Sequence, residues 1–166
     1  MEKKTKRRIK RYWYDDTLGM FGKWRGVKSK PRILYNAIIL KMAEKIPFPW
    51  LKNAMLRRIG MRIGKGVVIH PRVRFDSLFP ELIEIGHNSV IGYGTTILSH
   101  EFLVNEYRKG YVKIGRNCLI GALSFLLAGI TIGDNAVVGA YSLVNRDVGK
   151  RELAAGVPAR IIKKLG

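Results

Sequence analysis

The sequence holds one cysteine, Cys118, among 166 residues. An internal disulfide is therefore excluded, and a single thiol is typical of a protein kept in a reducing compartment. No apolar run is long enough to cross a bilayer, and the first residues lack the apolar stretch of a secretory signal. These absences predict a cytoplasmic protein, and they favour a packed thiol for Cys118.

Acidic residues are also scarce: the chain has 12 Asp and Glu but 31 Lys and Arg, which gives a net charge of +19. The excess is uneven: residues 1–62 carry 18 basic side chains against 4 acidic ones, and residues 63–166 carry 13 against 8. No nucleic-acid recognition motif accompanies the basic segment. We expect residues 1–30 to form a solvated basic arm, and we expect no nucleic-acid partner.

Apolar residues recur every six positions through most of the chain after residue 62. Ten of these twelve residues are β-branched, which favours strands. Six of them are followed three positions later by Gly or Asn, the residues that best tolerate the positive φ of a sharp corner. The twelve are Ile63, Ile69, Phe75, Ile85, Ile91, Ile97, Ile114, Ile120, Leu126, Ile132, Val138 and Val144. Short strands joined by corners and stacked in this way predict a parallel β-helix, in which each coil is buried by its neighbours.

The period is broken twice. Ile63 and Ile85 are 22 residues apart, which leaves four extra residues near positions 78–82. Ile97 and Ile114 are 17 residues apart, and the eleven extra residues, 103–113, predict a loop thrown out from the coil. Loops on a rigid scaffold are where function concentrates.

Residues 33–59 predict two short helices separated at Pro47 and Pro49. Two interpretations of this segment stay open. The helices pack on the first coil or on a neighbouring subunit, or their apolar and basic residues lie on an anionic membrane surface. We therefore treat residues 31–60 as a separate helical segment, and residues 1–59 as the candidate membrane contact.

The C-terminal stretch VVGAYSLVNRDV, followed by AAGVPARIIKKLG, is similar to the ending of the hexapeptide-repeat acyltransferases, of the maltose and galactoside O-acetyltransferase type. The resemblance covers roughly residues 52–166. It implies an all-β fold, a left-handed parallel β-helix of about four coils over residues 61–166, with N-terminal helices and a short C-terminal extension. It also implies a homotrimer that uses acetyl-CoA, with each active site between two subunits.

The resemblance implies a role for His100, at the entry to the 103–113 excursion. In the family, a His at such an entry is the general base that deprotonates the acceptor, a task that suits imidazole. Glu101 and Glu106 are candidates for the group that orients His100, and the choice between them is open. His70 and His87 have no evident partner and are expected at the surface.

The resemblance also implies a set of cofactor contacts. Two of them are backbone contacts to the pantetheine arm, and the others are polar or basic side chains near the adenosine and phosphate end. The six residues are Ala122, Ala140, Asn145, Arg146, Arg160 and Lys163. The sequence departs from the family at Tyr141, where a small residue is usual.

The expected function is therefore an acetyl-CoA-dependent O-acetyltransferase that acts on a sugar or a lipid-linked sugar, without a metal. One alternative is a non-catalytic trimeric scaffold held at an anionic membrane. A second is a zinc enzyme that resembles the γ-class carbonic anhydrases. That site needs two closely spaced His, whereas the three His of this chain are 17 and 13 residues apart.

Overall fold

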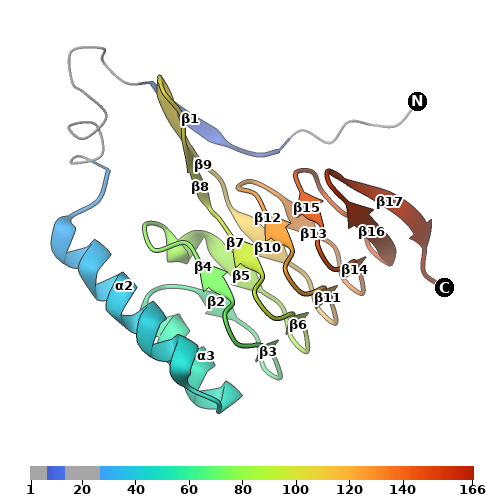
Figure 1. Ribbon diagram of the computed structural model, residues 1–166, viewed down its shortest axis with the longest axis horizontal. Coiled ribbons are helices and arrows are strands. Elements are labelled where there is room, and N and C mark those ends of the chain that lie inside the picture. The colour runs from blue at the N-terminus through green and yellow to red at the C-terminus, as the bar shows by residue number, and fades with distance from the viewer. Residues whose placement is uncertain (1–6, 14–26) are drawn as a thin grey trace.

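The computed structural model describes residues 7–13 and 27–166. Its main body is a three-sided prism of parallel strands, one sheet to each side (Figure 1). The first sheet contains β2 (Arg62–Ile63), β5 (Ile83–Ile85), β10 (Val112–Ile114) and β13 (Thr131–Ile132). The second contains β3 (Val68–Ile69), β6 (Val90–Ile91), β11 (Leu119–Ile120), β14 (Val137–Val138) and β16 (Glu152–Gly156), with β17 (Ala159–Lys164) antiparallel at its edge. The third contains β4 (Arg74–Phe75), β7 (Thr96–Ile97), β12 (Phe125–Leu126) and β15 (Leu143–Val144).

The six-residue ladder fills the interior of the prism, as predicted. Eleven of the twelve ladder residues are buried, and Phe75 is partly buried. The residues expected at the corners all have positive φ, namely Gly66, Asn88, Gly94, Asn117, Gly129 and Asn135. Each ladder residue stacks on its equivalents one coil away, because the strands pair in parallel without a shift. The buried aliphatic column therefore fixes the register of every coil.

The two predicted helices, α2 (Lys30–Lys45) and α3 (Pro49–Arg58), cover the first coil at one end of the prism (Figure 1). N–H groups in and beside the strands of the first coil bond to carbonyls of the second, so carbonyls such as Val67 O and Ile69 O point to the end of the prism. Side chains of α3 supply the missing donors: Lys52 Nζ lies 3.0 Å from Ile69 O, and Asn53 Nδ2 lies 2.8 Å from Val67 O. Burial lowers the pKa of Lys52.

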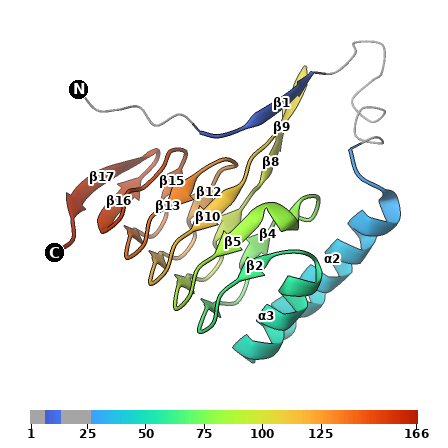
Figure 2. The same cartoon turned by 180° about the vertical axis from the view of Figure 1, so that it is seen from behind.

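The predicted loop excursion at 103–113 belongs to a β-hairpin that begins at His100. β8 (His100–Phe102) turns back into β9 (Glu106–Lys109), and β1 (Lys10–Trp13) adds a third antiparallel strand. Both views show this small sheet projecting from one side of the prism (Figures 1 and 2). Residues 10–13 of the predicted solvated arm form a strand of this sheet, and three of the four are exposed. Residues 1–6 and 14–26 of that arm lie outside the described part of the chain.

Candidate active site

Both interruptions of the repeat leave the prism at the same corner, one coil above the other. β4 and β7 pair in register, so Phe75 lies opposite Ile97 in the next coil. The first interruption follows Phe75 and contains a short 3₁₀ helix, η2 (Pro80–Leu82). The second follows Ile97 and leads into β8. Asp76, which begins the lower excursion, is thereby placed directly against His100 at the start of the upper one.

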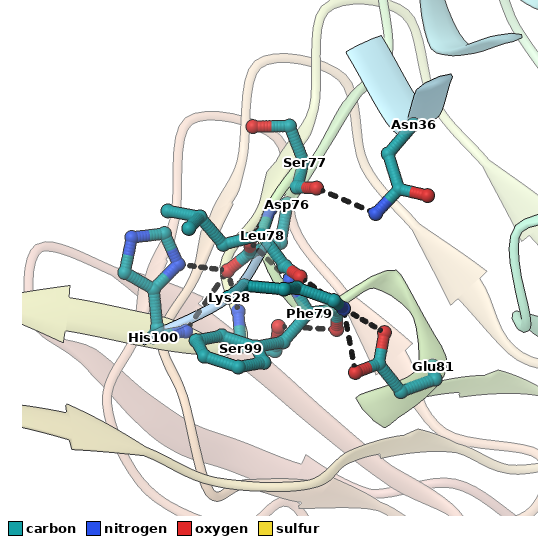
Figure 3. Close-up of polar contacts among 9 residues, drawn as sticks. All are labelled: Lys28, Asn36, Asp76, Ser77, Leu78, Phe79, Glu81, Ser99 and His100. Atoms are coloured by element: carbon teal, nitrogen blue, oxygen red, sulfur yellow. Dashed lines mark hydrogen bonds and ion pairs between the residues drawn. The ribbon is translucent and has the colours of Figure 1, made fainter. Parts of the chain in front are cut away.

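Asp76 is the centre of a dense hydrogen-bond network, drawn in Figure 3, and its side chain is fully buried. Oδ1 accepts bonds from the backbone N–H groups of Leu78 at 2.9 Å and Phe79 at 3.1 Å. Oδ2 accepts bonds from the N–H groups of Ser99 and His100, both at 2.9 Å. Oδ2 also lies 2.5 Å from His100 Nδ1. The carboxylate therefore stabilises both excursions and fixes the imidazole ring.

The Asp76 carboxyl is an anion at neutral pH. Burial alone raises its pKa and is the largest single influence. The hydrogen bond from His100, the positive charge that the His100 ring can carry, and the N–H groups of Phe79 and Ser99 together outweigh burial. The pKa of Asp76 is therefore below its ordinary value of 3.8.

The His100 ring is oriented so that one nitrogen remains available. Because Nδ1 faces a carboxylate, the neutral ring carries its proton on Nδ1, and Nε2 keeps its lone pair. Within the described residues, Nε2 makes no hydrogen bond. The rings of Phe79 and Phe102 contact the imidazole edge-on, with centroids 5.8 and 4.9 Å away. The side chain is 15% exposed, so the arrangement suits a base that takes a proton from a bound molecule.

Neither carboxylate that the sequence suggested as the orienting group contacts His100. Glu101 forms an ion pair with Arg7, and Arg7 Nη2 lies 3.1 Å from Glu101 Oε2. Glu106 is buried and accepts a bond of 2.6 Å from Arg108 Nε. The orienting residue is Asp76, which sequence reasoning missed.

A sequence signal for Asp76 was present. It directly follows a ladder residue, a position that Gly occupies in seven of the other blocks. Both breaks in the period also follow the third ladder residue of a coil, Phe75 or Ile97. Two insertions at the same corner of successive coils must lie side by side, so their polar residues are the natural candidates for a shared site.

Two of the residues expected to contact the cofactor stack at another corner of the prism. Ala122 follows β11 and Ala140 follows β14, so both lie between the second and third sheets. Ala122 O accepts a bond of 2.9 Å from Tyr141 N. A Cβ at Gly121 would lie 2.4 Å from Ala140 N, so the two coils approach closely there. Tyr141 adopts positive φ and is 69% exposed, so its ring lies outside the corner and does not fill it.

The other four residues expected to contact the cofactor lie nearer the C-terminus. Asn145 and Arg146 follow β15 and are partly exposed, at the same corner of the prism as His100 but in a later coil. Arg160 and Lys163 are exposed on β17. Within one chain, the third sheet separates Ala122 and Ala140 from His100, so a single chain does not bring all the predicted residues to one place.

The remaining candidates occupy ordinary structural positions. Cys118 is buried, and burial raises the pKa of its thiol. His70 is exposed, and so is His87, whose Nδ1 accepts a bond of 3.0 Å from Lys65 N. Across residues 7–13 and 27–166, no three His, Cys, Asp or Glu side chains gather where they could hold a metal ion.

The chain is similar to known acetyltransferases over most of its length. A family profile described as the hexapeptide repeat of succinyl-transferase matches residues 111–143. YvoF from Bacillus subtilis strain 168, which is named an acetyltransferase, is 42% identical over 142 residues, covering 84% of this chain and 83% of YvoF. The galactoside O-acetyltransferase of Escherichia coli K12 is 36% identical over 123 residues, covering 70% and 61% of the two chains.

Solved structures agree with the fold. A hexapeptide-repeat acetyltransferase from Vibrio cholerae in complex with acetyl coenzyme A superimposes with a TM-score of 0.70 at 20% identity, over 87% of this chain and 92% of that one. A galactoside acetyltransferase in complex with coenzyme A gives 0.65 at 22% identity, over 92% and 86%. The chain therefore belongs to the hexapeptide-repeat acetyltransferases, enzymes built on a left-handed parallel β-helix.

Proposed function

We propose that the protein transfers the acetyl group of acetyl-CoA to a hydroxyl of a sugar or sugar-containing acceptor, with His100 as the general base. The observation that carries this proposal is the contact between Asp76 and His100. A buried anion on Nδ1 and an unbonded Nε2 are the arrangement that a proton-accepting imidazole needs.

In the proposed reaction, Nε2 of His100 takes the proton of the acceptor hydroxyl as its oxygen attacks the thioester carbon. The bond between that carbon and sulfur breaks, and coenzyme A leaves as a thiol with the proton that His100 returns. Asp76 stays ionised throughout and stabilises the imidazolium. General-base catalysis contributes about 10²- to 10⁴-fold, so alignment of the two substrates supplies much of the remaining acceleration.

We propose a homotrimer whose active sites lie between subunits. The separation of Ala122 and Ala140 from His100 within one chain supports this, because a second copy can present its cofactor corner to the His100 of the first. Light scattering of the purified protein tests the subunit number. Proteins mixed from His100→Ala subunits and subunits altered at the cofactor corner would regain some activity only if sites are shared.

Arg160 and Lys163 are proposed to bind the phosphates of acetyl-CoA. The double variant Arg160→Ala/Lys163→Ala is expected to bind acetyl-CoA about 10- to 100-fold more weakly, because charge-assisted bonds to phosphate are strong. Both side chains are exposed on the edge strand β17, so their loss leaves the fold intact. Calorimetric titration with acetyl-CoA and coenzyme A measures the change.

The matched control is Lys65→Ala, which removes an exposed positive charge from the first coil, at the opposite end of the prism. It is expected to bind acetyl-CoA as the unaltered protein does. Equal weakening by both changes would mean a general loss of charge attraction, and the assignment of Arg160 and Lys163 would be wrong.

We further propose that the helical end of the protein binds an anionic membrane surface. Five large apolar residues there are between 49 and 70% exposed: Leu34, Ile38, Met42, Phe48 and Trp50. The first three are spaced four residues apart on the outer side of α2, and the other two lie at the turn into α3. α2 carries one acidic residue, Glu44, against four basic ones. In the described residues, no helix is long and apolar enough to cross a membrane, so the contact would be interfacial.

The variant Phe48→Ala/Trp50→Ala is expected to lose at least about tenfold in affinity for vesicles of phosphatidylglycerol and phosphatidylcholine, because each buried aromatic contributes roughly 1.5–3 kcal/mol. Co-sedimentation at two salt concentrations measures the affinity. The control Val157→Ala/Ile162→Ala removes equally exposed apolar residues from the opposite end of the prism. If the first variant instead loses its subunit contacts in light scattering, the surface belongs to the oligomer and the membrane proposal fails.

A further inference from the structure

The sheet formed by β1, β9 and β8 presents two rows of side chains on the face that carries His100. Strand pairing places residues opposite one another across the three strands, and alternate residues along each strand share a face. The first row is His100, Lys109 and Lys10; the second is Phe102, Tyr107 and Tyr12. A row of lysines and a row of aromatic rings therefore extend from His100 across the sheet, and β1 contributes the last residue of each row.

The aromatic row is continuous. The His100 and Phe102 rings lie 4.9 Å apart, the Phe102 and Tyr107 rings 5.9 Å apart, and the Tyr107 and Tyr12 rings stack at 4.5 Å with 8° between their planes. Phe102, next to the base, is 39% exposed. A row of rings that begins at a catalytic imidazole offers the apolar face of a sugar a surface on which to stack.

Lys109 lies in this surface and forms no ion pair with the described residues. Its Nζ sits 4.9 Å from the centroid of Tyr12 and 5.0 Å from that of Phe79. Lys28 also lies over Phe79, but it forms an ion pair of 2.8 Å with Glu81. In residues 7–13 and 27–166, no carboxylate lies within ion-pair distance of Lys109. A partly buried ammonium that no described carboxylate pairs with, opposite His100 in the sheet, is suited to an anionic group on a ligand.

Hydrogen bonds and ion pairs of the residues just before β1 hold the N-terminal strand against the prism. Arg8 N donates a bond of 2.8 Å to Gly129 O, and the Arg8 guanidinium bonds both oxygens of Asp147 at 3.0 and 3.1 Å. The chain passes so close that a Cβ at Gly110 or Gly129 would lie 2.7 Å from Arg8 O. Arg7 pairs with Glu101, the residue after the base. These contacts hold Lys10 and Tyr12 in line with β9.

We infer that this face is the acceptor-binding surface and that the acceptor is a sugar bearing an anionic group. The sugar ring stacks on Phe102 and the neighbouring tyrosines, and the anion binds Lys109. This inference rests on the proposed function, since it takes His100 as the base toward which the acceptor hydroxyl points. Phosphate and carboxylate share the required chemistry.

The experiment compares three probes of one ring type: galactose 6-phosphate, galacturonate and the neutral methyl galactoside. Binding is measured by saturation-transfer NMR and by acetyl transfer from acetyl-CoA. At least one anionic probe is expected to bind about tenfold or more tightly than the neutral one, and the two anionic probes separate phosphate from carboxylate. In Lys109→Met, which keeps the apolar contact with the rings, this preference is expected to disappear. The control Lys113→Met changes a half-exposed lysine on the first sheet and is expected to keep it.

Tyr12 provides the second test. Tyr12→Ala is expected to raise the KM for the sugar about tenfold, with the Kd for acetyl-CoA unchanged, whereas Tyr12→Phe keeps the ring and the KM. Two results would contradict this inference while acetyl transfer stays intact. In the first, the neutral probe binds as tightly as the anionic ones; in the second, Lys109→Met still prefers an anionic probe. Either result would mean that the acceptor binds on another surface. Failure to bind acetyl-CoA at all would overturn the proposed function itself, and the binding of the three sugars would still be measurable.

Discussion

The variant His100→Ala is expected to lose acetyl transfer by about 10²- to 10⁴-fold, the usual contribution of a general base. The fall should be in kcat, because the imidazole acts on the acceptor proton and holds neither the phosphates nor the pantetheine arm of acetyl-CoA. Steady-state kinetics with an acceptor found by screening sugars, together with calorimetry for acetyl-CoA, separates the two effects.

His70→Ala is the matched control for this experiment, since it removes an exposed His of the same β-helix that directly follows β3 of the second sheet. It is expected to keep full activity. If His100→Ala keeps the kcat of the unaltered protein, His100 is not the base. If it loses its subunit contacts or its affinity for acetyl-CoA, its role is structural.

The second large effect is expected from Asp76→Asn, which should lower kcat by about 10²-fold or more. The isosteric amide cannot reproduce the network, because both carboxylate oxygens accept bonds from backbone N–H groups. Whichever way the amide is turned, its NH₂ group faces donors and leaves at least one buried N–H without an acceptor, at a cost of about 1–3 kcal/mol. If the oxygen faces Leu78, the NH₂ group faces His100 and favours the tautomer with its proton on Nε2, which cannot act as a base.

The pH dependence of the free energy of unfolding tests whether the Asp76 carboxylate stabilises the fold as an anion. The folded pKa of Asp76 is below the ordinary value of 3.8 that applies in the unfolded chain, so the unfolded state binds the proton first on acidification. The stability due to Asp76 is present in full above that value, and it is lost as the pH falls through the lower folded pKa. Unfolding free energies from chemical denaturation should therefore fall more steeply with acid in the unaltered protein than in Asp76→Asn. Parallel curves would contradict this account of Asp76.

The body of the fold could be predicted from the sequence because its physics is local and periodic. A residue such as Ile91 or Ile120 lies inward because its block is six residues long, and its partners are its own equivalents one coil away. Asn88 and Asn117 mark corners because their side chains tolerate positive φ. Few other arrangements satisfy both constraints over so many blocks.

The site could be predicted only in part, since it depends on contacts between excursions. The family resemblance, together with a place at a break in the period, indicates His100, but its partner Asp76 lies 24 residues earlier, and only the geometry of the corner joins them. Glu101 and Glu106 are closer to His100 in the sequence, but their carboxylates pair with Arg7 and Arg108. The pairing of β1 with β9 joins segments about 100 residues apart, and the alternation in KRYW and EYRK is too short to indicate it.

The polar side chains of α3 have a consequence for how the protein behaves in a crowded solution. A stack of parallel coils ends in a row of unpaired backbone groups, and such an open edge can template the addition of another molecule's strands. In the second sheet, Lys52 and Asn53 occupy two carbonyls at one end, and the antiparallel strand β17 pairs with the last parallel strand, β16, at the other. Burying a lysine costs stability unless its ammonium is hydrogen-bonded, and here the bond to Ile69 O both compensates that cost and occupies a carbonyl that an added strand would need.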